Sequence, residues 1–128
     1  MNVKIKYELP IFSSSLEGDP IVESKDMNIE IKLLGRDEGG RLRKISLKFN
    51  AVICYKYTSV RFTPKLFNSY DRVVELLDSE WLDELKKINA ESFAYWNPKH
   101  YITYLDDSGL FQFIAQGYEV IEHKLKAD

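Results

Sequence analysis

The chain has 128 residues, of which 45% are hydrophobic and 30% are charged, and its formal net charge is −2. This length predicts a single domain over residues 1–128 with one core, and the slight negative charge disfavours a general nucleic-acid binder. No stretch is apolar enough to span a membrane, and Met1–Tyr7 lacks the apolar core of a signal peptide. We therefore expect a cytoplasmic protein with no membrane partner.

Alternating apolar and polar residues predict strands at residues 3–9 and 28–33. Between them, residues 11–26 are polar and contain a Gly-Asp-Pro turn signal at Gly18, which predicts a connection rather than a strand. Ile21 and Val22 are its only adjacent aliphatic pair, so we expect them to anchor it. The glycine-containing stretch 35–40 then predicts a hairpin-like turn.

The longest strand pattern covers residues 42–57. Its odd-numbered positions from Ile45 to Tyr57 are apolar and include Phe49 and Tyr55, whereas most even-numbered positions are polar. If the period of two holds, the odd positions share one face. The run is far longer than the usual strand of about six residues, so we expect a bend or a bulge near Asn50 and Ala51.

Residues 58–77 allow two interpretations. Pro64 after Thr63 could begin a helix over 64–77; alternatively, a loop leads into a strand at 72–77, which we favour because Asp78-Ser79 begins a new helix. That helix covers residues 79–88, with an N-cap at Asp78 or Ser79 and an apolar stripe of Trp81, Leu82, Leu85 and Ile88. We expect it to cover the sheet with Trp81 as its anchor, and residues 89–98 to form a connection.

The last third predicts a β-hairpin. Strand-like runs at 100–105 and 110–115 flank an Asp-Asp-Ser-Gly turn, in which Gly109 takes the positive φ. Both runs are apolar on both sides, which is typical of strands in the middle of a sheet. The whole pattern predicts an α+β fold: a curved, mostly antiparallel sheet of about six strands, barrel-like or half-open, with one main helix packed on it.

The sequence offers few residues for catalysis. His100 and His123 have no neighbouring ligands at the spacing of a metal site, and the single cysteine, Cys54, lies in an apolar run typical of a small buried side chain. No phosphate-binding loop and no nucleophile elbow is present. We therefore predict no catalytic residue, no metal and no cofactor, and we expect binding rather than an enzyme.

Two surfaces are candidates for a partner protein. The first is a row of lysines on the polar side of the predicted sheet, represented by Lys44, Lys48 and Lys56. Such lysines also form the ordinary solvated face of a sheet. The second is the aromatic segment with Phe93, Tyr95 and Trp96, because tyrosine and tryptophan are enriched in binding hot spots.

The segments Asp78–Leu85, His100–Gly109 and Ile114–Val120 together resemble a set of small bacterial single-domain proteins with no established activity. The resemblance covers roughly residues 70–121. In size and in their lack of catalytic motifs, such proteins are similar to the immunity partners of bacterial toxins. The resemblance implies a strand, a helix and a hairpin in this order, and it implies no site residues.

Two functions follow as hypotheses. The first is a non-catalytic bacterial protein that binds another protein, for example as a toxin-neutralising immunity protein. Residues 1–64 carry a net charge of +3 and residues 65–128 one of −5, an asymmetry that favours a protein partner. The alternative is a small-molecule-binding or enzymatic cup inside the curved sheet. Its predicted lining residues are Tyr7, Tyr55, Tyr57, His100 and Tyr104.

Overall fold

The computed structural model describes residues 2–125 as an α+β fold built on one eight-stranded, mostly antiparallel sheet. The strands are β1 (Val3–Glu8), β2 (Ile11–Leu16), β3 (Ile21–Lys25), β4 (Asn28–Asp37), β5 (Leu42–Thr58), β6 (Arg72–Leu76), β7 (Lys99–Leu105) and β8 (Gly109–His123). The helices are α1 (Glu80–Ile88) and α2 (Ala90–Trp96), with a short 3₁₀ turn, η1, at Val60–Phe62. The strand order is β1-β6-β7-β8-β5-β4-β2, and β3 also pairs with β4.

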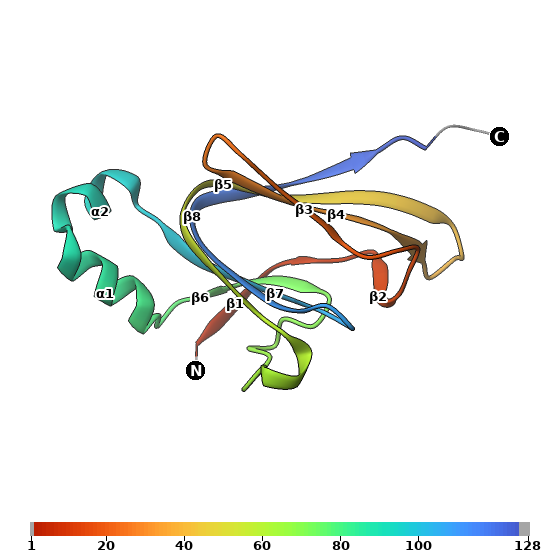
Figure 1. Cartoon of the computed structure of the whole chain (residues 1–128), viewed down its shortest axis with the longest axis horizontal. Helices are drawn as coiled ribbons and strands as arrows, with labels where there is room; N and C mark the ends of the chain where they lie inside the picture. Colours follow the sequence, from red (N-terminus) through yellow and green to blue (C-terminus); the bar gives the residue numbers. More distant parts are fainter. Residues whose placement is uncertain (1, 126–128) are drawn as a thin grey trace.

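The sheet folds back on itself to form two layers (Figure 1). The upper layer contains β3, β4, residues 42–50 of β5 and residues 117–123 of β8; the lower layer contains β1, β6, β7 and the remaining parts of β5 and β8. The long strands β5 and β8 bend together, where Ala51 has a φ of 52° and the pairing register shifts between Val52 and Cys54. The bend predicted near Ala51 is therefore confirmed.

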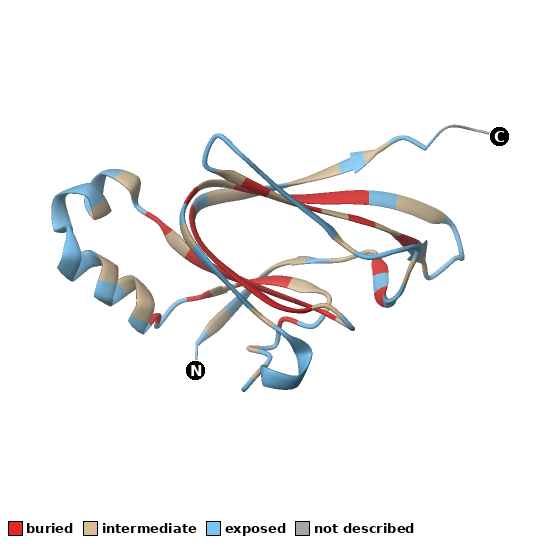
Figure 2. Ribbon diagram, viewed as in Figure 1, coloured by how far each residue is buried: buried red, intermediate tan, exposed pale blue. Residues whose placement is uncertain are grey.

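The main core lies between the layers (Figure 2). Ile31, Leu47 and Phe49 of the upper layer meet Tyr101 and Phe113 of the lower layer. The rings of Phe49 and Phe113 stack with their centroids 4.1 Å apart. Alternation within each strand supplies this core, because successive side chains point to opposite faces.

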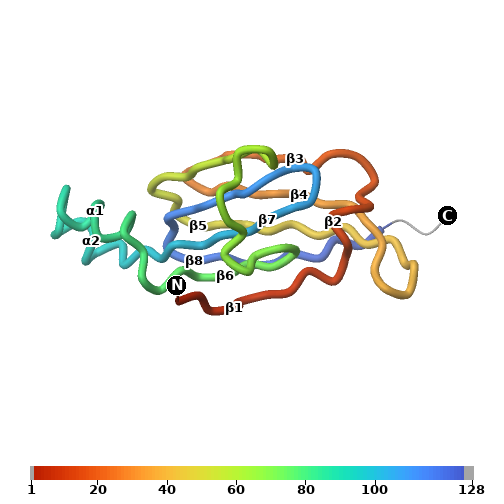
Figure 3. Tube along the Cα trace, turned by 90° about the horizontal axis from the view of Figure 1, so that it is seen from below, coloured from red at the N-terminus to blue at the C-terminus, as the bar shows by residue number. Residues whose placement is uncertain are grey.

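A second apolar cluster covers the outer face of the lower layer. Val74, Ile102 and Leu110 are buried there, and Phe67 packs against them from the segment between β5 and β6. Figure 3 shows this segment crossing the lower layer. Both faces of the lower layer are therefore covered over much of its area. Residues Arg72–Leu76 form the strand β6, which confirms the strand that we favoured over a helix at 64–77.

The helices differ from the prediction in number and in place. Two helices are present among residues 2–125, and both lie beyond one end of the sheet rather than on its face (Figure 1). Neither has a buried residue, because the faces that a helix could cover are occupied by the other layer and by residues 59–71. Trp81, the predicted anchor, is half-buried. The predicted connection at 89–98 contains α2, which begins where Asn89 accepts a hydrogen bond from the Ser92 amide.

The predicted number of strands was also wrong, since residues 11–25 form β2 and β3. Both strands pair only with β4 among the described residues: β3 forms one edge of the upper layer, and β2 pairs with residues 35–37 at the end of β4. All five residues of β3 are exposed. The two buried residues of β2 are Ile11 and the polar Ser13. Edge strands of this kind are held by backbone hydrogen bonds and lack the strong apolar alternation that predicts a strand.

The sheet is open, so the barrel-like alternative is wrong. Its two ends, β1 and the β2–β3 edge, are not paired with each other within residues 2–125. The C-terminal hairpin is confirmed as β7 and β8, both interior strands, and Gly109 has a φ of 128° as expected. None of the helices among the described residues is long and apolar enough to cross a membrane.

Candidate binding groove

The bend in β5 leaves half of this strand with a free edge. Pairing between β4 and β5 ends at Ile29 and Phe49. Beyond the bend, β5 pairs with β8 as far as Thr58, and no other described strand pairs with this part. Residues 53–58 therefore lie at the edge of the lower layer, on the side of the molecule where β3 forms the edge of the upper layer (Figures 1 and 3).

Four aromatic side chains connect the core to this edge. Tyr55 lies opposite Phe113 and Tyr57 opposite Phe111, so each pair shares the inner face of the lower layer. The ring centroids are 6.3 Å apart in the first pair and 5.0 Å apart in the second. Tyr55 and Tyr57 are 62% and 52% exposed, whereas Phe113 and Phe111 are only 1% and 8% exposed. The aromatic surface thus continues from the buried core into solvent.

These rings form the floor of a groove of about 440 Å³, here called the aromatic groove. Its opposite wall comes from Asp19 and Pro20 in the β2–β3 connection and from Val22 of β3. Asp107 and Ser108 of the β7–β8 turn close one end. The groove therefore lies between the free edges of the two layers.

The β7–β8 turn is fixed against β5. The Tyr57 hydroxyl donates a hydrogen bond to the Ser108 carbonyl oxygen. Gly109 follows with a φ of 128°, and a side chain at this position would collide with the Thr58 carbonyl oxygen. Glycine is required here because only glycine combines this backbone conformation with so close an approach.

The polar groups that line the groove are acidic. Asp19 and Asp107 are its only charged lining residues among the described part of the chain, and Ser108 is uncharged. Most of the exposed lining is apolar, as in typical ligand sites. The groove is therefore suited to an apolar or aromatic group that carries a positive charge at one side.

Three apolar residues outside the lining of the groove are also exposed: Ile21 on β3 is 55% exposed, Ile53 on β5 is 40% exposed and Phe62 in η1 is 80% exposed. Ile21 lies opposite Lys32, on the other face of β3 from the lining residue Val22. Exposed apolar residues scattered in this way are common, so the binding surface is defined by the groove itself.

The opposite face of the lower layer carries a polar cluster formed by Ser79, His100 and Gln112. The Ser79 hydroxyl is 2.7 Å from His100 Nδ1, and His100 Nε2 is 2.8 Å from Gln112 Oε1. The Ser79 oxygen also accepts the Leu82 amide proton at the start of α1. Because Gln112 Oε1 can only accept, His100 Nε2–H is the donor to it. In the neutral imidazole Nδ1 then accepts the Ser79 hydroxyl proton.

Burial of the cluster favours the neutral form of His100. Burial lowers the pKa of His100 below its ordinary value of 6.5; the hydrogen bond to Gln112 opposes this shift, and the charge of Lys56 adds to it. Trp81 packs its ring edge-on against the imidazole, with centroids 5.3 Å apart. Both ring nitrogens have partners, and neither partner is a carboxylate that would stabilise an imidazolium during catalysis. The polar cluster connects α1 to the sheet.

The residues of the predicted cup do not line one cavity. Tyr55 and Tyr57 lie in the aromatic groove. Tyr7 is half-buried in β1, next to the main core. His100 and Tyr104 occupy alternate positions of β7 that face outward, whereas Tyr101 between them faces the main core. Burial raises the pKa of Tyr101 to about 12.

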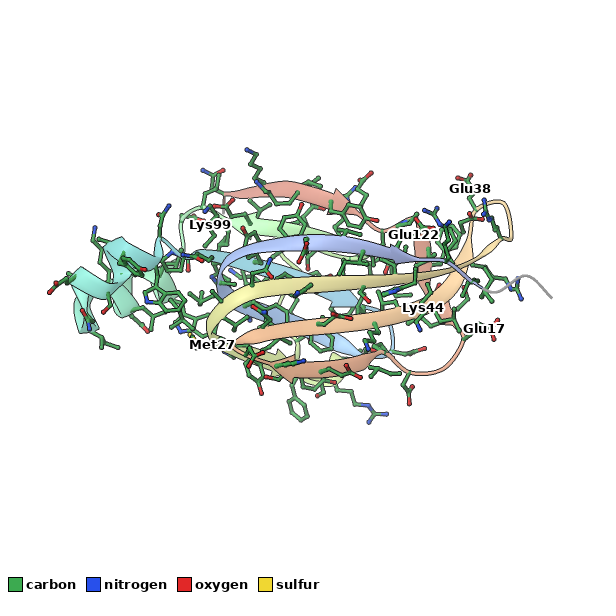
Figure 4. The ribbon with its side chains drawn as sticks, turned by 90° about the horizontal axis from the view of Figure 1, so that it is seen from above. Glu17, Met27, Glu38, Lys44, Lys99 and Glu122 are labelled. Carbon is green, nitrogen blue, oxygen red and sulfur yellow. The ribbon has the colours of Figure 1, made fainter. Side chains whose placement is uncertain are left out.

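The predicted partner-binding residues fall into three separate places. Phe93, Tyr95 and Trp96 lie on α2, where Tyr95 is 82% exposed. Lys44 projects from the outer face of the upper layer (Figure 4), and nearby Lys48 pairs with Glu119 at 3.6 Å. Lys56 belongs to the part of β5 in the lower layer, beyond the bend. The lysines therefore form no continuous basic stripe.

Sequence analysis missed the wall of the groove formed by Val22 and Asp19, and it did not identify Phe111 and Phe113 as its floor. The bend near Ala51 was the available signal, because it separates Tyr55 and Tyr57 from β4. Among residues 2–125, no group of three or more histidine, cysteine or acidic side chains could hold a metal ion. Comparison with known proteins identifies no relative: no protein family, curated protein or solved structure matches this chain.

Proposed function

We propose that the chain binds another protein through the aromatic groove. The observation that supports this function best is the exposure of Tyr55 and Tyr57 beside a free strand edge, on a floor of buried phenylalanines. Tyrosine contributes a large, rigid contact area with a hydroxyl that can still form hydrogen bonds. Residues of this type dominate the binding energy of protein interfaces.

The open shape of the groove favours a protein over a small molecule. A small-molecule site encloses most of its ligand, whereas the aromatic groove is open and Tyr55 and Tyr57 in it remain more than half exposed. Its volume of about 440 Å³ would also suit a compact ligand. Binding of a small apolar molecule is therefore the alternative, and the experiment below distinguishes the two.

Neutralisation of a toxin is a narrower form of this function. It fits a groove whose charged lining residues, Asp19 and Asp107, are both acidic, because such a groove can bind a basic segment of a partner and cover it. This role stays a prediction that depends on the identity of the partner.

Site-specific photo-crosslinking in cells that naturally produce the chain tests the proposed function. A benzoylphenylalanine at the exposed position Val22 lies at the wall of the groove, and the same group at Lys44 projects from a different face and serves as the control. We expect a protein adduct of defined mass from position 22, with none from position 44. The adduct should disappear when Tyr55→Ala is added.

Two results would contradict protein binding. One is the absence of any adduct that depends on Tyr55. The other is an adduct of equal intensity at both positions, which would indicate random contact. If no adduct forms but a small apolar dye binds saturably and loses affinity in Tyr55→Ala, the aromatic groove is a small-molecule site.

A further inference from the structure

The free edge of β5 exposes backbone groups as well as side chains. In an antiparallel ladder, alternate residues direct their N–H and C=O groups to opposite sides of the strand. Residues 53–58 have β8 on one side only. Among the backbone hydrogen bonds of residues 2–125, none connects residues 53–58 to a second strand. Some of their N–H and C=O groups are therefore available to another strand.

The available edge lies beside the aromatic groove. Ile53 to Thr58 span about 17 Å at about 3.4 Å per residue, which is long enough for a segment of five or six residues. Across the groove, Val22 of β3 is 49% exposed and contributes to the opposite wall. An extended segment along β5 would therefore place alternate side chains against Tyr55 and Tyr57 and lie below β3.

We propose that the partner contributes an extended, cationic segment that adds to β5 as a new edge strand. Its apolar side chains cover Tyr55 and Tyr57, and its lysine or arginine side chains meet Asp19 and Asp107. Strand addition gives affinity through main-chain hydrogen bonds and selectivity through alternate side chains. This inference rests on the proposed function and specifies how the aromatic groove recognises its partner.

The charges at the groove support this occupant over a second copy of the chain. Asp19 and Asp107 are the charged lining residues, and they have no cation beside them in the groove. If two copies paired antiparallel through β5 about Lys56, the two Lys56 side chains would lie opposite each other, and like charges at such positions are destabilising. That pairing would also bring no positive charge to Asp19 and Asp107.

The test uses the full chain, labelled with ¹⁵N, and a capped hexapeptide whose alternate, groove-facing positions carry isoleucine, isoleucine and lysine, with serine between them, because side chains on one face of a strand are two residues apart. Two methylated forms of the peptide carry N-methyl groups on one or the other alternate set of backbone amides. We expect the parent peptide to shift the amide signals of residues 53–58 saturably. One methylated form should bind about tenfold more weakly because its amides can no longer donate to β5, and the other should bind like the parent.

Strand addition is wrong if both methylated forms bind like the parent, if both are weakened equally, or if the parent causes no saturable shifts in residues 53–58. These results would leave the proposed function intact if the crosslinked adduct at position 22 still depends on Tyr55. Loss of that adduct, by contrast, would remove the proposed function itself. A concentration-dependent dimer that blocks the peptide would identify the second copy as the occupant and overturn the proposal.

Two variants of the chain and a second peptide test whether the added segment must carry positive charge. Asp107→Asn should weaken binding of the lysine peptide about threefold, as expected for one exposed ion pair, and Lys44→Ala should leave it unchanged. A peptide with glutamate in place of the groove-facing lysine should bind more weakly than the lysine peptide. Equal binding of the two peptides, or no effect of Asp107→Asn, would show that the segment need not be cationic.

Discussion

The aromatic groove and the polar cluster use opposite faces of the same strand, β8. Phe111 and Phe113 face the groove, whereas Gln112 between them belongs to the polar cluster. In the cluster, Ser79 and both ring nitrogens of His100 have partners inside the fold. In the groove, two tyrosines remain more than half exposed. Polar side chains whose hydrogen-bond partners lie within the fold contribute to stability, whereas aromatic side chains that remain exposed are available to bind a partner.

The largest difference in the stability cost of a substitution is expected within the groove itself, between Phe113 and its cross-strand neighbour Tyr55. Phe113→Ala should lower the free energy of unfolding by about 3–5 kcal/mol, because it removes a ring that stacks on Phe49 in the main core. Tyr55→Ala should cost less than about 1 kcal/mol. Urea unfolding measures both. Similar losses in the two variants would show that Tyr55 belongs to the core rather than to a binding surface.

Substitutions in the polar cluster should have the next largest effect on the free energy of unfolding. His100→Ala removes the partner of Ser79 and of Gln112 and leaves buried polar groups without hydrogen bonds. The expected loss of stability is about 2–3 kcal/mol. Ser79→Ala should cost about 1–2 kcal/mol, since it also removes the N-cap of α1. If both variants unfold at the same urea concentration as the original chain, the cluster is not structural and deserves examination for another role.

Stability should also depend on pH through His100. Its pKa is lowered in the folded chain, with burial as the main cause. Between that value and about 6.5, the unfolded chain binds more protons, so protonation favours unfolding. The contribution of His100 is therefore fully present above about pH 6.5 and is lost as the pH falls toward the folded pKa.

Unfolding free energies between about pH 5 and pH 8, where a histidine titrates, measure this effect. His100→Gln should show a smaller decrease in stability on acidification than the original chain. Asp71 acts in the opposite direction, because burial raises its pKa and its protonation favours the folded state. The difference between the two chains isolates the histidine, and parallel pH profiles would contradict a neutral, buried His100.

Much of the sheet could be predicted from residue alternation. In β4 and β5 the apolar positions form one face of the upper layer, and in β7 and β8 continuous apolar runs indicated buried interior strands. The edge strands could not be found in this way. β3 buries none of its side chains, so its strand conformation comes from backbone pairing with β4, and no side-chain pattern reports it. For α2, the capping residue Asn89 was the only local signal.

The residues of the candidate site could also be predicted only in part from the sequence pattern. Tyr55 and Tyr57 were predicted to line a binding cup because they share the odd positions of β5, and both line the aromatic groove. His100 and Tyr104 were assigned to the same cup although they lie on the opposite face of the lower layer. Which face of a strand borders a groove depends on the fold of the entire sheet. Here the bend at Ala51 decides it, because beyond the bend β5 no longer pairs with β4, and Tyr55 lines the same groove as Val22 of β3.

The smallest effect of a substitution on stability is expected on the outer face of the upper layer, where oppositely charged side chains pair in contact with solvent. Lys48 and Glu119 are cross-strand neighbours whose charged groups lie 3.6 Å apart, with side chains 31% and 52% exposed. Exposed pairs of this kind contribute little, because water screens the attraction and both side chains lose freedom. Lys48→Ala should therefore change the free energy of unfolding by less than about 0.5 kcal/mol and leave the crosslink at position 22 intact. A loss of that crosslink in Lys48→Ala would place part of the binding surface on this face, and the lysines would then act together with the aromatic groove.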